Sequence, residues 1–292
     1  MLKESDIIKC FITQNDCYKK YQKMTPKGIV VHDTAAGNVW LNRYTQPSSD
    51  DPNRAELLKL IGQNKYNNHW NKSGVSKAVN AFIGQRADGE LAVCQTLPWD
   101  CAPWGCGSGT KGSYNNTHIQ FEIQDDNYNA GKGTKEYFEK AMNKAIELCA
   151  YLANKYNIPI SEIVNHSEAN KLGYASNHSD TVPWMTKYGW TMDIFRQKVK
   201  EKIDEVKEAE NQPDSEPEKE KKVYIVHAGG FGKKEEALEA VEKVKGIYSS
   251  AYVSQINGVF YARCETNANR DYALRNAEKL EDLVENPGIF VK

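Results

Sequence analysis

The sequence lacks any hydrophobic segment long enough to cross a membrane, and its first residues lack the pattern of a signal peptide. None of its apolar runs approaches the roughly 18 residues that a membrane-spanning helix needs. Its start, MLKESDIIKCFITQND, carries acidic residues early and no apolar stretch of signal-peptide length. We therefore expect a protein made in the cytoplasm without a signal peptide and with no stable membrane insertion.

The sequence also lacks an excess of charge of either sign. Its 38 lysines and arginines nearly balance 39 aspartates and glutamates, which gives a formal net charge of -1. No global field therefore favours nucleic acid or an anionic membrane as a partner. The hydrophobic content of 40% is typical of a folded globular protein.

Cysteine is present, but without the pattern of a disulfide framework. Seven cysteines are an odd number in a chain without a secretion signal, which favours free thiols. Cys101 and Cys106 resemble a zinc knuckle only loosely, because no second pair stands at a suitable spacing. We interpret them as structural.

A charged segment without large apolar residues divides the chain. Residues 208–222 read EAENQPDSEPEKEKK, with two prolines and dense charge, which is typical of a linker. Both flanking regions are richer in aliphatic and aromatic residues. We expect a first domain over residues 1–207, a flexible linker over 208–222 and a second domain over 223–292.

The first domain combines strand and helix patterns. GIVVHDTAAG predicts a buried strand ending at His32, and VNAFIG and ELAVCQTL flank a hairpin turn at residues 86–89. THIQFEIQ alternates, which places Glu122 on its polar face. Helical spacing of apolar residues extends over residues 134–156 and again over 195–206. Strands interleaved with helices predict an α/β or α+β domain.

The second domain contains an internal repeat. EALEAVEKV (236–244) and YALRNAEKL (272–280) align at an offset of 36 residues, each with helical spacing. VYIVHA precedes the first repeat, AYVSQ and VFYARC surround an Asn-Gly hairpin signal, and GIFVK closes the chain. The expected order is βαββαβ on one small sheet.

A polar segment, VNHSEANKLGYASNHSD at residues 164–180, has little to bury and many side chains able to bind a metal. Catalytic zinc takes three protein ligands and leaves one position open. If this segment is a loop, it can bring His166 and Asp180 to one ion together with His32, while His178 overhangs the ion. From spacing alone, surface histidines and a turn aspartate remain an equal alternative, and Glu122 remains a solvent-facing strand residue.

IVVHDTA and, far downstream, NHSEANKLGYASNHSD resemble the zinc-dependent N-acetylmuramoyl-L-alanine amidases of the amidase-2 type. That family includes many phage endolysins and the peptidoglycan recognition proteins, and the resemblance covers residues 25–195. It implies a mixed central sheet flanked by helices. It also implies hydrolysis of the amide between N-acetylmuramic acid and the first L-alanine of peptidoglycan.

The same resemblance assigns roles by position. His32, His166 and Asp180 match the family's Zn²⁺ ligands. Glu122 matches the acidic residue on a central strand, expected to act as the general base. His178 falls where the family keeps a cationic residue two positions before the third ligand, expected to stabilise the oxyanion.

Two positions depart from the family pattern. Asp33 stands where a second histidine commonly follows the strand histidine, and Gly105 replaces the histidine of the usual Trp-His motif. Trp104 keeps its place in that motif and is the expected substrate-binding residue. Other loop aromatics are expected either to rim the cleft or to pack in the core: Tyr66, Trp70 and Trp99.

Residues 223–292 resemble a SPOR-type module in their βαββαβ order and internal repeat. Those modules bind the glycan strands of peptidoglycan. The expected partners are therefore glycan strands and stem peptides, without nucleic acid, and a holin for release if the protein is a phage endolysin. Two alternatives remain open: a non-catalytic peptidoglycan-binding module, and a cytosolic amidase that recycles soluble muropeptides.

Overall fold

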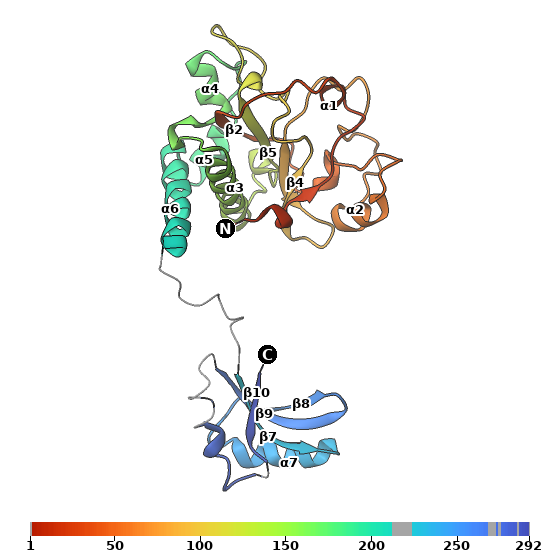
Figure 1. Ribbon diagram of the computed structural model, residues 1–292, viewed down its shortest axis with the longest axis vertical. Helices are drawn as coiled ribbons and strands as arrows, with labels where there is room; N and C mark the ends of the chain where they lie inside the picture. The colour runs from red at the N-terminus through yellow and green to blue at the C-terminus, as the bar shows by residue number, and fades with distance from the viewer. Residues whose placement is uncertain (1, 212–223, 268–272, 274–275, 285, 292) are drawn as a thin grey trace. The chain divides into compact units, whose positions relative to one another are not determined.

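The computed structural model describes residues 2–211, 224–267, 273, 276–284 and 286–291. The chain divides into two compact units, Met1–Asn211 and Gln212–Lys292, and Figure 1 shows the secondary structure of each. Helix α6 (Met192–Asn211) extends into the first residues of the expected linker, and the remainder of that linker lies outside the described residues.

The first unit is built on a six-stranded mixed sheet in the order β1-β4-β3-β5-β2-β6. Within it, β3 and β4 are antiparallel, whereas the other neighbouring strands are parallel. β2 includes Asp33, one residue beyond the predicted end, and the predicted hairpin joins β3 to β4. The strands are β1 (Ile8–Lys9), β2 (Gly28–Asp33), β3 (Ala81–Gln85), β4 (Leu91–Gln95), β5 (His118–Ile123) and β6 (Ile163–Asn165).

Helices cover both faces of this sheet (Figure 1). On one face, α3 (Lys135–Tyr156), α5 (Val182–Lys187) and α6 pack on side chains such as Val31 and Phe121. Phe82 and other alternate residues point to the opposite face, towards α2 (Arg54–Ile61). The short helices α1 (Asp16–Lys20) and α4 (His166–Leu172) complete the unit. The expected α/β fold with a mixed central sheet flanked by helices is thus confirmed.

The long helix α3 agrees closely with its sequence pattern. Thr134 caps its start, because its hydroxyl accepts a hydrogen bond from the backbone N–H of Tyr137 at 3.1 Å. Asn157 ends it in the left-handed region, at φ 54°. In the described part of the chain, no helix has both the length and the apolar character to cross a bilayer.

The second unit has a four-stranded antiparallel sheet in the order β10-β7-β9-β8. Its elements are β7 (Tyr224–Phe231), α7 (Lys234–Val244), β8 (Tyr252–Ile256), β9 (Val259–Asn267) and β10 (Gly288–Val291). The hairpin forms at the predicted Asn-Gly pair, where φ is 50° at Asn257 and 87° at Gly258. The predicted second helix lies partly outside the described residues, and residues 273 and 276–278 of it are helical.

All seven cysteines lie in the described residues, and all are buried and form no disulfide among those residues, as predicted. Cys106 packs with Val30 and Val164 beneath the candidate site. Burial is the main reason that its thiol pKa is raised, so the group stays protonated near neutral pH. This supports a structural role for Cys106.

Candidate metal centre

The candidate residues meet where three parallel strands end at one edge of the sheet. His32 lies near the end of β2, directly beside Glu122 on β5. His166 is the first residue after β6, the neighbour of β2 on its other side. Ligand sites are common at this edge, because the loops that follow parallel strands gather there.

The segment 164–180 is only partly the loop that its composition predicted. Its start completes β6 and forms α4, which a capping box stabilises: Asn165 Oδ1 accepts from the N–H of Glu168 at 2.8 Å. Arg196 fastens that glutamate to α6, with Nη1 2.8 Å from its Oε2. His166 is therefore held on a rigid element, and only the part after α4 loops back to deliver Asp180.

The three predicted ligands lie together. One ligand atom from each of His32, His166 and Asp180 falls within 4.8 Å of the other two. Nδ1 of His32 is 2.9 Å from Asp180 Oδ2 and 3.2 Å from Nδ1 of His166, which is itself 3.5 Å from Asp180 Oδ1. Both imidazoles are buried, whereas the aspartate is partly exposed.

The outer nitrogens of both imidazoles are already used. Nε2 of His166 donates to the backbone carbonyl of Ser176 at 3.1 Å, and Nε2 of His32 donates to Gln120 Oε1 at 3.1 Å. The Nδ1 lone pairs therefore point at each other and at a carboxylate, and they repel one another unless a cation lies between them. Two imidazoles and one carboxylate are suitable donors for Zn²⁺, so the residues present fit the ion.

Gln120 is held in the orientation that this arrangement requires. Asn115 Oδ1 accepts from the backbone N–H groups of Gly105 and Cys106, at 3.2 and 3.0 Å. These two donors require that the oxygen of the Asn115 amide, and not its nitrogen, lies here. Gln120 Nε2 donates to that oxygen at 2.9 Å, which turns its Oε1 towards His32. Sequence reasoning missed both amides; a buried polar residue alternating with Glu122 on β5 was the available signal.

The two acidic groups of the site have opposite protonation tendencies. Burial opposes ionisation of Asp180, but the adjacent His166 and His32 imidazoles hold its pKa well below the usual range. Burial and the nearby Asp180 charge raise the pKa of Glu122 to about 8. Part of Glu122 is exposed, yet its Oε2 is buried with no hydrogen-bond partner among the described residues.

Asp33, at the departure from the family pattern, also faces the cleft. Burial, with the charge of Asp180 nearby, raises its pKa well above the usual value. Tyr128 donates its hydroxyl to Asp33 Oδ1 at 3.4 Å, and the other carboxylate oxygen has no partner among the described residues. This environment favours the neutral form of the Asp33 carboxyl.

The cleft around the cluster has a volume of about 550 Å³. His178 lines it, exposed and stacked on His166 with ring centroids 4.8 Å apart. Arg43 and Lys77 supply positive charge to the same cleft, and neither was singled out in the sequence.

The four loop aromatics occupy different places. Trp70 lines the cleft, whereas Trp99 is buried in the core and Tyr66 lines a neighbouring hollow. Trp104 is partly buried against the cluster that contains Leu97 and is absent from the described residues that line the cleft.

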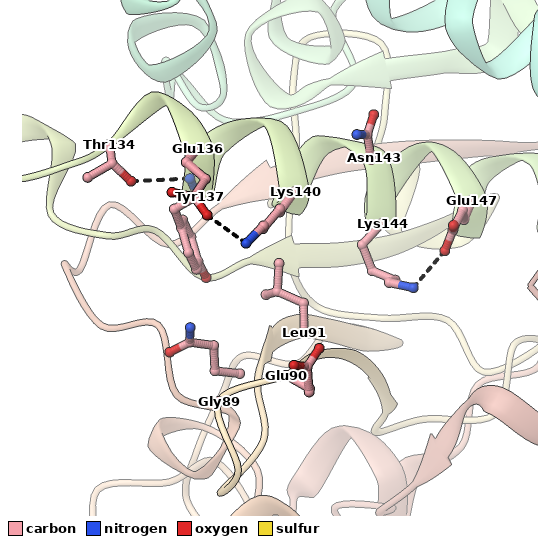
Figure 2. Close-up of a pocket in the computed structure, with 11 residues that line it drawn as sticks. Gly89, Glu90, Leu91, Thr134, Glu136, Tyr137, Lys140, Asn143, Lys144 and Glu147 are labelled. Carbon is pink, nitrogen blue, oxygen red and sulfur yellow. Dashed lines mark hydrogen bonds and ion pairs between the residues drawn. The ribbon is translucent and has the colours of Figure 1, made fainter. Parts of the chain in front are cut away.

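A second hollow, of about 600 Å³, lies between α3 and the β3–β4 hairpin and contains none of the predicted site residues (Figure 2). The charged side chains that α3 contributes to it are paired along the helix. Lys140 donates to Glu136 and Lys144 to Glu147, each at 2.7 Å. The charges on α3 are therefore satisfied locally, unlike those of the cleft.

A protein-family model described as N-acetylmuramoyl-L-alanine amidase matches residues 22–183, more than half of the chain. The matched range contains the three clustered candidate ligands together with Glu122 and His178. A search of curated proteins found no match.

Several solved structures are similar to this chain. The Staphylococcus aureus hydrolase AmiA in complex with its ligand is 19% identical, over 73% of this chain and 90% of that chain, with a TM-score of 0.45. PlyL is 22% identical, over 66% of this chain and 96% of PlyL, with a TM-score of 0.42. The catalytic domain of XlyA is 21% identical, over 66% and 98%, with a TM-score of 0.43.

Proposed function

The chain belongs to the N-acetylmuramoyl-L-alanine amidase family, and on that premise we propose that it is a zinc-dependent enzyme. Its reaction is hydrolysis of the amide between the lactyl group of N-acetylmuramic acid and the first L-alanine of peptidoglycan. The observation that carries the proposal is the convergence of two buried imidazole Nδ1 atoms and one carboxylate, with both outer nitrogens already engaged.

His32, His166 and Asp180 would hold the metal in this proposal. Zn²⁺, when bound, supplies Lewis acidity towards the amide carbonyl and towards a water nucleophile. The low pKa of Asp180 keeps it a carboxylate, as a ligand must be. Hydrogen bonds from the imidazoles to Ser176 and Gln120 fix which ring nitrogen faces the ion.

Glu122 is the proposed general base. It lies beside His32 on the adjacent strand, and a pKa of about 8 lets it gain and lose a proton near neutral pH. It takes the proton of the attacking water and returns it to the departing alanine nitrogen. The positive charge of a bound metal would offset the charge of Asp180 and bring the pKa of Glu122 down towards the working range.

His178 is the proposed donor to the developing oxyanion. Its ring is exposed in the cleft and stacked on His166, so it is close to the ligands without being one of the three clustered groups. One such donor contributes roughly 3 to 4 kcal/mol to transition-state stabilisation. Trp104 remains a proposed substrate contact, although its packing away from the cleft favours a supporting role.

We further propose that residues 223–292 form a SPOR-like module that binds glycan, with residues 208–222 as its linker to the catalytic domain. Apolar packing against α7 covers one face of its sheet. On the other face the rings of His227 and Phe290 stack with their centroids 3.9 Å apart, and Tyr261 contacts both rings edge-on. Aromatic faces pack well against sugar rings, and tethering to an insoluble polymer raises the local substrate concentration.

This combination favours an endolysin- or autolysin-type enzyme over one that recycles soluble muropeptides, since a tethering module helps only on a polymer. If the protein is a phage endolysin, a holin would release the enzyme to the cell wall.

The test is incubation of the full chain with insoluble peptidoglycan, with and without a zinc chelator. New L-alanine amino ends without new reducing sugars, lost on chelation and restored by zinc, are the expected result. Reducing ends would indicate a glycosidase, and binding without new ends would favour a recognition module.

A further inference from the structure

A smaller hollow, of about 400 Å³, adjoins the catalytic cleft. That volume is in the range of roughly 300 to 1,000 Å³ in which small-molecule sites fall. It lies between the end of α2, the segment before β3 that contains Trp40, and the β3–β4 turn. Arg43 lines both the hollow and the cleft, so the two are neighbours that share one wall residue.

Two exposed aromatic side chains line this hollow. Tyr66 is 85% exposed and Trp40 41% exposed, so neither is spent on the core. The backbone of Trp40 is anchored, because its N–H donates to Asn38 Oδ1 at 3.0 Å and its residue bridges Gln85 of the sheet. An exposed ring on an anchored backbone offers a flat apolar face at little cost in conformational entropy.

The rest of the lining is rich in amides. The Asn64 side chain is already engaged within the loop, since its Nδ2 donates to the carbonyl of Asn42 at 2.8 Å. In contrast, Asn38 Nδ2, Asn42 Oδ1 and the Gln63 side chain have no hydrogen-bond partner among the described residues. These groups can donate to and accept from a neutral ligand. No carboxylate is among the described residues that line the hollow.

Arg43 connects the two sites rigidly. Its Nη1 donates to the carbonyl of Asn68 at 2.6 Å, and its guanidinium lies over the ring of Tyr44 at 4.5 Å. Tyr44 in turn contacts Trp70, another residue of the cleft wall, with ring centroids 5.1 Å apart. A ligand that extended from the cleft past Arg43 would enter the hollow that Trp40 and Tyr66 line.

We propose that this hollow is a carbohydrate subsite, which binds an N-acetylhexosamine of the glycan strand next to the sugar in the catalytic cleft. The inference rests on the proposed amidase function. Apolar faces of a sugar ring pack on Trp40 and Tyr66, while its hydroxyl and N-acetyl groups bond to the spare amides. The protein therefore prefers substrates whose glycan extends beyond a single muramic acid.

The test compares kcat/KM of the full chain for an N-acetylmuramoyl dipeptide and for a tetrasaccharide that carries the same dipeptide. Tyr66→Ala and Trp40→Ala are each expected to lower kcat/KM about tenfold for the tetrasaccharide and to leave the monosaccharide substrate unchanged. Tyr66→Phe, which keeps the ring, is expected to behave as wild type. Tyr21→Ala removes a ring of 41% exposure outside the hollow and serves as the matched control.

An equal fall in kcat/KM for both substrates, or no change in kcat/KM in Tyr66→Ala, would overturn the subsite. Because Tyr66 is so exposed, its variant tests the idea even if Trp40→Ala does not fold. A response to a longer peptide instead of a longer glycan would mean that the hollow binds the stem. If wild type cleaves neither substrate, the amidase proposal fails. Binding of a peptide-free N-acetylglucosamine tetramer to wild type and to Tyr66→Ala then still decides the subsite.

Discussion

The cleft at the strand ends and the hollow beside α3 are similar in size but differ in how their charges are satisfied. In the hollow, lysine and glutamate pair along one helix and stay exposed, as in Glu136 with Lys140 (Figure 2). In the cleft, His32, His166 and Asp180 converge from separate elements, and a carboxylate oxygen of Glu122 is buried without a partner in the part of the chain that the structure describes. Buried groups that need a cation indicate chemistry better than volume does.

The largest expected effect is loss of a ligand from the cleft. His166→Ala should reduce the release of L-alanine amino ends from peptidoglycan to the uncatalysed background, because two donors cannot hold zinc in a catalytic geometry. Lys140→Ala, in the hollow beside α3, is the control and should keep wild-type activity. An active His166→Ala enzyme would remove the distinction between the two regions.

Removal of the proposed general base is expected to lower turnover without affecting zinc binding. Glu122→Gln should lower kcat by about 10² to 10⁴, while the zinc content measured by atomic absorption stays at the wild-type level. Glu136→Gln provides the same change of chemistry on α3 and should alter neither quantity. Loss of zinc from Glu122→Gln would show that this carboxylate is a ligand instead of a base.

The amide support of His32 should affect metal affinity. Gln120→Met leaves His32 Nε2 without its acceptor and should weaken zinc binding about 10- to 100-fold in a chelator competition. Gln124→Met makes the same change four residues along the chain, where the side-chain amide has no partner among the described residues, and should leave the affinity unchanged. Nitrogen-15 spectra of the metal-free protein should show His32 as the Nε2–H tautomer in wild type and as a mixture in Gln120→Met.

The buried carboxyl of Glu122 should also make the stability of the metal-free protein depend on pH. Its pKa is raised from 4.5 to about 8, so the folded state holds a proton that the unfolded state loses within that window. Stability should therefore fall by a few kcal/mol as pH rises through this range. Thermal melts of wild type at pH 5 and pH 8 should show the decrease, and Glu122→Gln should reduce it. An equal decrease in both proteins would refute this protonation.

The smallest effect is expected in the hollow beside α3. Partly exposed ion pairs one helical turn apart contribute little, because solvent reaches and screens them. Lys144→Ala, which breaks the pair with Glu147, should leave both the melting temperature and the activity unchanged within error. A clear loss of activity would give this hollow a function and weaken the contrast with the cleft.

Much of the fold could be predicted because local patterns agree with tertiary structure. The β3–β4 hairpin, α3 and the Asn257-Gly258 turn all carry strong short-range signals. Helix α4 was missed because its residues are polar, and the capping box of Asn165 and Glu168 was not recognised within them. A local signal for that helix was present in the sequence.

The candidate site was predictable in part for a different reason. The spacing of His32, His166 and Asp180 allowed a metal site but did not decide between it and surface residues. The family resemblance then supplied their roles. The partnership of Asn115 with Gln120 could not be predicted, because it depends on which backbone N–H groups face the amide after folding. The position of Trp104 likewise depends on packing against distant residues such as Ile12.

Titration of zinc into the chelator-treated full chain tests the metal centre most directly. We expect one tightly bound ion per chain in wild type, and loss of that tight site in His32→Ala, His166→Ala and Asp180→Ala. Lys140→Ala should bind as wild type does. A wild-type chain that binds no zinc, or tight binding that survives all three ligand substitutions, would contradict the assignment of the converging imidazoles and carboxylate as a metal centre.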